Sequence, residues 1–258
     1  MCTIFTAYKA HSRYALIVAA NRDEFYNRPT KSAHWWMESG ILAGKDLQGG
    51  GTWLGVNKLG KFSCLTNYRD IKDMRDDARS RGELITDFLT NDFSPLSYLD
   101  QIAEHGNLYN GFNLLTADLE HGLAYYSNKS GEPPVLLENG IYAVSNHLLD
   151  TPWPKVWKNR ILFEDMVENN DTFPVEAAFQ MLANPEIAED DELPSTGVSL
   201  EWERMLSAIW IQSPNYGTRV STVLTIDYEG NVDFEERSFE LNKGNRKFQF
   251  RLKNKVVL

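Results

Sequence analysis

The hydrophobic period of this chain switches repeatedly between that of strands and that of helices, and this constrains the fold more than any other feature. Short strands joined by glycine and asparagine turns are expected over 2–9, 13–21, 52–57, 61–68, 110–118, 123–128, 141–147, 218–230, 231–239 and 247–252. Helical periods occupy 80–89, 94–105, 151–169 and much of 172–210. This order runs from strands to helices, back to strands, to helices again and finally to strands, with connections of hairpin length. It predicts an α+β fold with mainly antiparallel sheets, rather than a regularly alternating doubly wound fold.

Individual segments sharpen this expectation. The strand over 61–68 carries apolar residues on both faces, with Phe62 and Cys64 opposite Leu65, so both faces should be covered. Ser94 and Pro95 stand where a helix cap and first turn belong. The helix over 151–169 should pack a broad apolar face of Val156, Trp157, Ile161, Phe163 and Val167. Without an internal repeat or a Pro/Ser-rich linker, residues 1–258 are expected to form a single domain.

Composition excludes several classes of function. The formal net charge of −10 disfavours a nucleic-acid partner or an anionic membrane surface. The apolar run at 14–20 is too short to span a bilayer, so we expect no membrane span and a cytoplasmic protein. Cys2, Cys64 and the five histidines show no metal-ligand spacing, so two free thiols and no metal site are expected.

Cys2 is the most informative single residue. If Met1 is removed, the chain begins with a cysteine whose own α-amine, with a pKa near ~7.7 to 8.0, can take the proton of its thiol. Nucleophile and base would then share one residue. From its position alone, however, Cys2 reads more simply as a small apolar residue of an edge strand.

Other segments could complete such a site. Asn21, Arg22, Asp23 and Glu24 follow the strand that would pair with the first, although four polar residues there also fit a solvated turn. Asn67 and Asn146 end apolar strands, where their side-chain amides could donate to an oxyanion or simply form turns. Arg219 starts a late strand, where it could be a cation of the site or an exposed charge on an edge strand.

Two further segments look chemical. GGGTWLG at 49–55 lacks the lysine and hydroxyl residue of a phosphate-binding loop, which favours a tight turn into a strand. HWWM at 34–37 is more typical of a core or lid than of a ligand surface.

Six motifs, in this order, resemble the NRDE family, also called the transport and Golgi organisation protein 2 family. They are MCTIF, ANRDEFYNRP, GGGTWLGVN, LTNYR, VSNHLLDTPWPKV and GTRVSTV. The pattern is also similar to that of the cysteine N-terminal-nucleophile hydrolases that include penicillin V acylase and bile acid hydrolase. This resemblance implies a four-layer αββα sandwich.

The resemblance also implies site roles. Cys2 would be the nucleophile and Asp23 would bind its α-amine, Asn67 and Asn146 would serve the oxyanion or orient the amine, and Arg219 would position the thiolate or substrate. Asn21, Arg22, Trp53 and His147 are expected to bind substrate. One departure stands out, because those acylases carry an arginine where this chain has Ala20, and the arginine of this chain is Arg22.

Two functions follow from these expectations. The first is hydrolysis of a linear amide bond of a small or acylated molecule through an acyl-thioester on Cys2, without a cofactor. The alternative, implied by the resemblance alone, is a haem or acyl-lipid binding and trafficking protein on the same fold. The sequence does not specify the oligomeric state.

Overall fold

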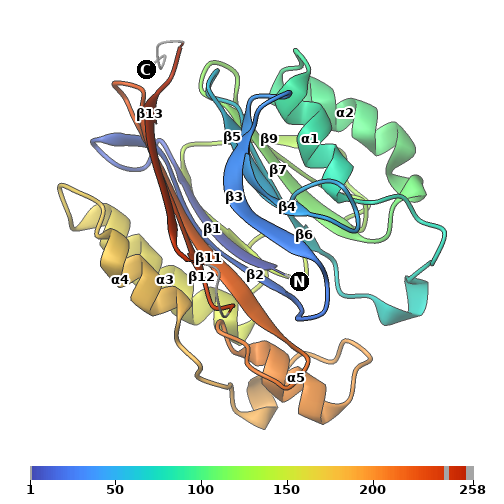
Figure 1. Cartoon of the computed structure of the whole chain (residues 1–258). Coiled ribbons are helices and arrows are strands. Elements are labelled where there is room, and N and C mark those ends of the chain that lie inside the picture. Colours follow the sequence, from blue (N-terminus) through green and yellow to red (C-terminus); the bar gives the residue numbers. More distant parts are fainter. Residues whose placement is uncertain (1, 241–243, 254–258) are drawn as a thin grey trace.

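The computed structural model describes residues 2–240 and 244–253, and within them the strands form two antiparallel sheets (Figure 1). The first sheet has the order β10-β1-β2-β11-β12-β13. Its strands are β1 (Cys2–Tyr8), β2 (Tyr14–Phe25), β10 (Gly140–Val144), β11 (Tyr216–Asp227), β12 (Asn231–Ser238) and β13 (Arg246–Arg251). Because β1 pairs with both β2 and β10, Cys2 begins an interior strand and not an edge strand.

The second sheet has the order β3-β4-β5-β6-β7-β8-β9. Its strands are β3 (Thr30–Trp36), β4 (Ile41–Asp46), β5 (Leu54–Asn57), β6 (Phe62–Asn67), β7 (Phe112–Asp118), β8 (Gly122–Ser127) and β9 (Val135–Leu137). As expected, β6 is covered on both faces: Phe62 and Cys64 pack between the sheets, whereas Leu65 packs against helices.

Helices cover the outer face of each sheet (Figure 1). α1 (Gly82–Thr90) and α2 (Pro95–His105) lie on the second sheet, and α3 (Pro154–Glu168) and α4 (Val175–Leu182) lie on the first. α5 (Leu200–Ser207) lies near the start of β11, where Leu206 packs with Tyr216. Three 3₁₀ turns complete the helical elements of the described residues: η1 (Ile71–Asp73), η2 (Gly106–Leu108) and η3 (Asp190–Glu192).

The predicted α+β fold and αββα layering are confirmed. One apolar cluster fills the space between the sheets, and two more lie under the helices on the outer faces. Burial on both sides of each sheet explains why β2 and β11 are buried almost throughout, although polar residues occur along both.

Some expected elements were wrong. Strands β3 and β4 were missed, and HWWM at 34–37 lies mainly on β3, at the edge of the second sheet. In 172–210, only α4, η3 and α5 are helical, because Pro174, Pro185 and Pro194 interrupt the period. NRDE is not a turn, since β2 continues to Phe25.

The apolar face of α3 is narrower than predicted. Val156, Phe163 and Val167 are buried, whereas Trp157 and Ile161 are 41% and 56% exposed. At 100° per residue, the two exposed positions fall to one side of the stripe that faces the sheet.

Candidate functional site

The pairing of β1 with β2 brings the two ends of the predicted site together. Cys2 lies directly opposite Arg22 in this antiparallel pair, so both side chains project from the same face of the sheet. Both line a cavity of about 410 Å³ between the sheets, together with Asp23, Trp53 and Asn67. Two residues that are twenty positions apart in the sequence thus become neighbours through sheet register.

Asp23 is a buried carboxyl group at a register shift in the pairing of β2 with β11. The Thr218 hydroxyl donates to its Oδ1 at 2.7 Å and accepts from the Ile211 N–H at 2.9 Å. Burial raises the pKa of Asp23, against the lowering effect of the positive charge of Lys155. Thr218 of β11, which is itself held by the Ile211 N–H in the preceding loop, therefore fixes the orientation of the Asp23 carboxyl group.

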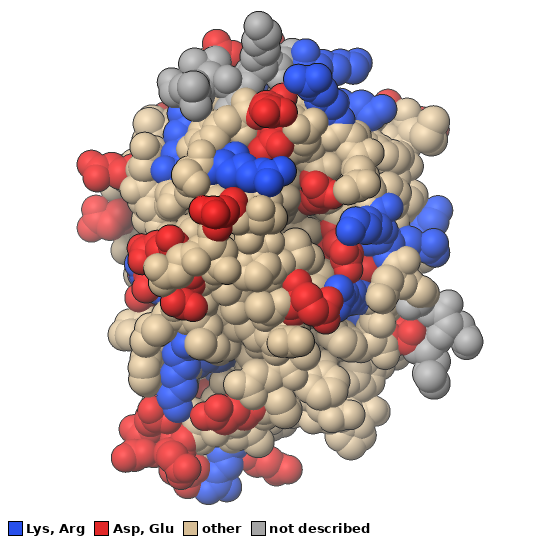
Figure 2. Space-filling view, turned by 90° about the vertical axis from the view of Figure 1, so that its left-hand side faces the viewer, with Lys and Arg blue, Asp and Glu red and all other residues tan. Residues whose placement is uncertain are grey.

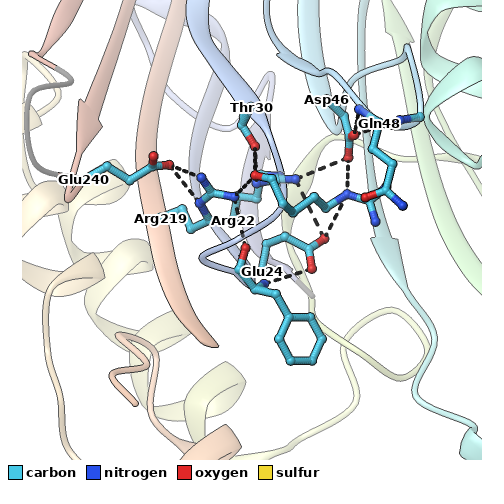
Figure 3. Close-up of polar contacts among 10 residues, drawn as sticks. Arg22, Glu24, Thr30, Asp46, Gln48, Arg219 and Glu240 are labelled. Atoms are coloured by element: carbon cyan, nitrogen blue, oxygen red, sulfur yellow. Dashed lines mark hydrogen bonds and ion pairs between the residues drawn. The ribbon is translucent and has the colours of Figure 1, made fainter. Parts of the chain in front are cut away.

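Arg22 is held by contacts on three sides. Its guanidinium lies 4.4 Å from the centre of the Trp53 ring, and it donates to Thr30 and Asp46 at 3.4 Å each (Figure 3). Its burial lowers its pKa, which the charges of Glu24 and Asp46 oppose. A cation with a fixed position therefore stands beside Cys2.

Glycines allow close packing of the segments that form the cavity wall. A Cβ on Gly44 would lie 2.2 Å from Cη2 of Trp53, so the six-membered ring of the indole packs closely against the β4 backbone. A Cβ on Gly51 would lie 2.3 Å from the main-chain carbon of Gly82, at the start of α1. The GGG segment therefore serves close packing of the loop against a helix, as the turn interpretation favoured.

The Cys2 thiol has competing influences. Burial raises its pKa, the negative charge of Asp23 raises it too, and the positive charge of Arg22 lowers it. Cys64 is the other described cysteine, and it is fully buried in the same apolar cluster, where burial raises its pKa well above the ordinary value. Cys2 is therefore the cysteine that lines the cavity next to a cation.

The two asparagines occupy different positions. Asn67 lines the cavity, and the structure gives its side chain no hydrogen bond with any described residue. Asn146 is fully buried, and its Nδ2 donates to the main-chain oxygen of Asn67 at 2.9 Å. Ser145 joins this group to the nucleophile, because its hydroxyl donates to the main-chain oxygen of Cys2 at 3.1 Å.

Four predicted site residues do not line the cavity, and Asn146 is one of them. Arg219 turns toward Glu240, with 2.8 Å between its Nε and a carboxylate oxygen, and is neither exposed nor on an edge strand (Figure 3). Asn21 points to the opposite face of the sheet from Arg22, where it donates to the Leu182 and Ile209 carbonyls. Strand alternation explains this separation.

His147 is the last of these four residues. Its ring accepts or donates at 2.9 Å to the Thr151 hydroxyl and packs against Tyr68 and Trp153. Burial lowers its pKa. The ring therefore belongs to an aromatic cluster that lies beside the asparagine network.

The amino-acid sequence is similar to those of known proteins. The family model Transport and Golgi organisation 2 matches residues 1–241. The chain belongs to this family. A Mus musculus member, Transport and Golgi organization 2 homolog, is 39% identical over 257 residues, with 92% of this chain and 93% of that protein covered. The Homo sapiens Transport and Golgi organization protein 2 homolog is 40% identical over 258 residues, with the same coverage.

Solved structures share the fold of this chain. A mutant of conjugated bile acid hydrolase from Clostridium perfringens is 11% identical with a TM-score of 0.53, covering 98% of this chain and 92% of that one. A second variant of the same hydrolase is also 11% identical, with a TM-score of 0.55, 100% of this chain covered and 99% of that one. The N-terminal-nucleophile-hydrolase-like fold is thereby confirmed, and at this identity the likeness concerns the fold alone.

Sequence reasoning missed several charged residues around the site. Arg81, just before α1, lines the cavity with Cys2. Lys155 of α3 is buried, its Nζ lies 3.4 Å from Oδ1 of Asn146, and burial lowers its pKa to about 8. Behind it, Arg69 pairs with Glu203 at 2.9 Å. A lysine close to two prolines in TPWPKVW offers a weak signal, and the other contacts have none in the sequence.

Two features are absent from the described residues. They contain no group of three or more His, Cys, Asp and Glu side chains that could hold a metal ion. Among them, no helix is long and apolar enough to cross a membrane.

Proposed function

We propose that this protein hydrolyses a linear, non-peptide amide bond of a small or acylated molecule, with Cys2 as the nucleophile. The observation that carries the proposal is the Cys2 thiol lining a cavity between a cation, Arg22, and a buried carboxyl group, Asp23. Asn67 adds amide donors at the same cavity. Cation, carboxylate and amide are the groups that an N-terminal cysteine requires.

In the first half of the reaction, removal of Met1 frees the α-amine of Cys2, which Asp23 orients. The amine takes the thiol proton, and the sulfur attacks the amide carbonyl carbon to form a C–S bond. The side-chain amide of Asn67 donates to the resulting oxyanion. The C–N bond then breaks as the α-ammonium gives its proton to the leaving amine, and an acyl-thioester remains.

In the second half, water reverses these roles. The α-amine takes a proton from a water molecule whose oxygen attacks the thioester carbonyl, and the C–S bond breaks. The thiolate takes back the proton, and a carboxylic acid leaves. Arg22 stabilises the thiolate in both halves, since its charge favours the ionised form of Cys2.

Asn146 and Lys155 support the site without touching substrate. Asn146 fixes the main chain of Asn67 through its 2.9 Å hydrogen bond, and Lys155 lies next to the Asn146 amide oxygen. Arg219 anchors the chain after β2, because its Nη1 donates to the Phe25 carbonyl at 3.1 Å. We therefore place these three residues in the supporting structure of the site.

A panel of N-acyl amides with varied acyl chains and amines tests the proposal by release of free amine. The wild type should turn over at least one of them, and Cys2→Ala should lower that rate by about a hundredfold or more, because the covalent route is lost. Cys64→Ala is the matched control, which removes a thiol from the same apolar cluster and should keep the rate. Equal turnover by Cys2→Ala would contradict the proposal.

The haem or acyl-lipid alternative stays a prediction. A hemin titration tests carriage: a saturable Soret shift that is the same in Cys2→Ala would favour it over hydrolysis.

A further inference from the structure

The cavity that holds Cys2 is unusually rich in guanidinium groups for an acidic protein. It is lined by five arginines, namely Arg22, Arg28, Arg75, Arg79 and Arg81. The chain as a whole carries a formal net charge of −10. On the face that Figure 2 shows, the coloured acidic and basic side chains are interspersed and form no broad basic patch. The arginines of the cavity are therefore a local concentration of positive charge.

Carboxylates neutralise three of these arginines. Arg28 lies 2.6 Å from Asp46, and Arg22 shares that carboxylate and also Glu24 (Figure 3). Arg79 pairs with Glu83 at 2.7 Å. These three groups have their counter-charges within the protein.

Arg81 is different. Its Nη1 donates to the Gly111 main-chain oxygen at 2.8 Å, and the structure gives it no ion pair with any described residue. Arg81 and Cys2 line the same cavity. Burial lowers the pKa of Arg81 to about 10, and the negative charges of Cys2 and Glu24 oppose that change. A partly buried cation without a directly paired carboxylate has a desolvation cost that an anionic ligand offsets.

Arg75 stands on the same wall. Its Nη2 donates to the Asn107 main-chain oxygen at 2.5 Å, and its main chain is held by Asn110 on both sides, at 2.8 and 2.9 Å. No described carboxylate forms an ion pair with Arg75 either, although Asp76 follows it in the exposed loop. Both arginines therefore bind only main-chain oxygens and keep N–H groups for a ligand.

We propose that Arg81, with Arg75 beside it, forms a subsite for an anionic group, a carboxylate, sulfonate or phosphate, on the molecule that Cys2 attacks. The identity of the molecule as a substrate rests on the proposed function, but the binding of an anion beside Cys2 does not. Guanidinium groups recognise such oxyanions through paired, charge-assisted hydrogen bonds.

Paired alkylating reagents test the subsite without a known substrate. Iodoacetate and iodoacetamide differ by a negative charge, and peptide mapping gives the rate of each at Cys2. The ratio of these rates is divided by the same ratio for N-acetylcysteine. We expect the normalised ratio to exceed one in the wild type and to fall by about tenfold in Arg81→Gln, because hydrogen bonds to charged groups contribute at least this much.

Two variants serve as controls. Arg81→Lys keeps the charge and should retain most of the preference for iodoacetate. Arg13→Gln removes the same charge from the β1–β2 hairpin, at the far end of the strands from Cys2, and should leave the ratio unchanged. A wild-type ratio of one or less, or an equal ratio in Arg81→Gln, would overturn the proposal.

Competition in the wild type decides the matter even if Arg81→Gln fails to fold. At constant ionic strength, N-acetylglycine or inorganic phosphate should slow iodoacetamide labelling of Cys2 more than chloride or neutral N-acetylglycinamide does. Protection by the carboxylate alone, or by phosphate alone, identifies the type of anion, and protection by neither overturns the subsite. If the anion effect is found and no amide is hydrolysed, the subsite stands and the proposed reaction fails.

Discussion

Replacement of Arg22 by glutamine should slow the reaction of Cys2 with neutral electrophiles. Opposed residues of an antiparallel pair lie roughly 5 Å apart, and Coulomb's law with an effective dielectric constant of about 20 then gives roughly 3 kcal/mol for a guanidinium and a thiolate. Glu24 and Asp46, at 3.7 and 3.4 Å from the same guanidinium, cancel much of this interaction. About 1 kcal/mol should remain, which is a roughly fivefold lower rate.

The assay is the rate of iodoacetamide labelling of Cys2 as a function of pH. Since Arg22 lowers the pKa of the thiol, its removal raises that pKa and moves the rising limb of the rate profile to higher pH. At a pH above both pKa values, the variant and the wild type should react equally fast. The fivefold difference therefore belongs to neutral pH.

Arg28→Gln is the matched control for this prediction. Arg28 shares Asp46 with Arg22 and lines the same cavity, but it follows β2 instead of lying opposite Cys2. Its removal should change the rate by about twofold or less, because Arg28 pairs closely with Asp46 and is not the residue that faces Cys2 across the strand pair. If folded Arg22→Gln, checked by circular dichroism, reacts as fast as the wild type with the same pH profile, the assigned role of Arg22 is refuted.

Two further substitutions test the packing and the charges around the site. Gly44→Ala should lower the free energy of unfolding in urea by about 1–3 kcal/mol, because its Cβ would lie 2.2 Å from Trp53. Gly140→Ala is the control: its Cβ would have no contact below 3.5 Å, so the substitution should be nearly neutral. Equal effects of the two substitutions would contradict this prediction. Lys155→Met should remove a pH dependence of stability, because Lys155 has a pKa of about 8 in the folded state and near ~10.4 in the unfolded state. Between these values the unfolded state binds more protons, so the wild type becomes more stable as the pH rises. The stability of the variant relative to the wild type should therefore fall by roughly 2–3 kcal/mol between pH 7.5 and 10, and parallel stability curves would contradict this prediction.

The fold was predictable because its signals are local. Strand and helix periods, with their order, gave the antiparallel α+β class, and β6 showed from its residues that both faces are covered. Strand β3 was missed because TKSAHWW mixes polar and aromatic residues at a sheet edge, where the alternation is weak. β-strand propensity depends on side-chain packing against neighbouring strands, so it gives a weak signal for an edge strand that pairs with one neighbour.

Strand register made one part of the site predictable, and the family resemblance added Trp53 and Asn67, which line the cavity. Cys2 and Arg22 meet because β1 and β2 form a hairpin, which the sequence indicated. Arg81 lies just before α1 and Lys155 lies on α3, so they approach the site from different layers, and no local pattern encodes those contacts. Asn21 shows the opposite effect: it adjoins Arg22 in the sequence, yet strand alternation turns it away from the cavity.

The proposed chemistry requires Cys2 to be the first residue of the working protein. The intact mass of the purified full-length protein, expressed in a host with methionine aminopeptidase, measures this without a known substrate. We predict the mass of residues 2–258, with a free α-amine on Cys2. A chain that retains Met1 would leave no free amine beside the thiol, and it would contradict the proposed chemistry.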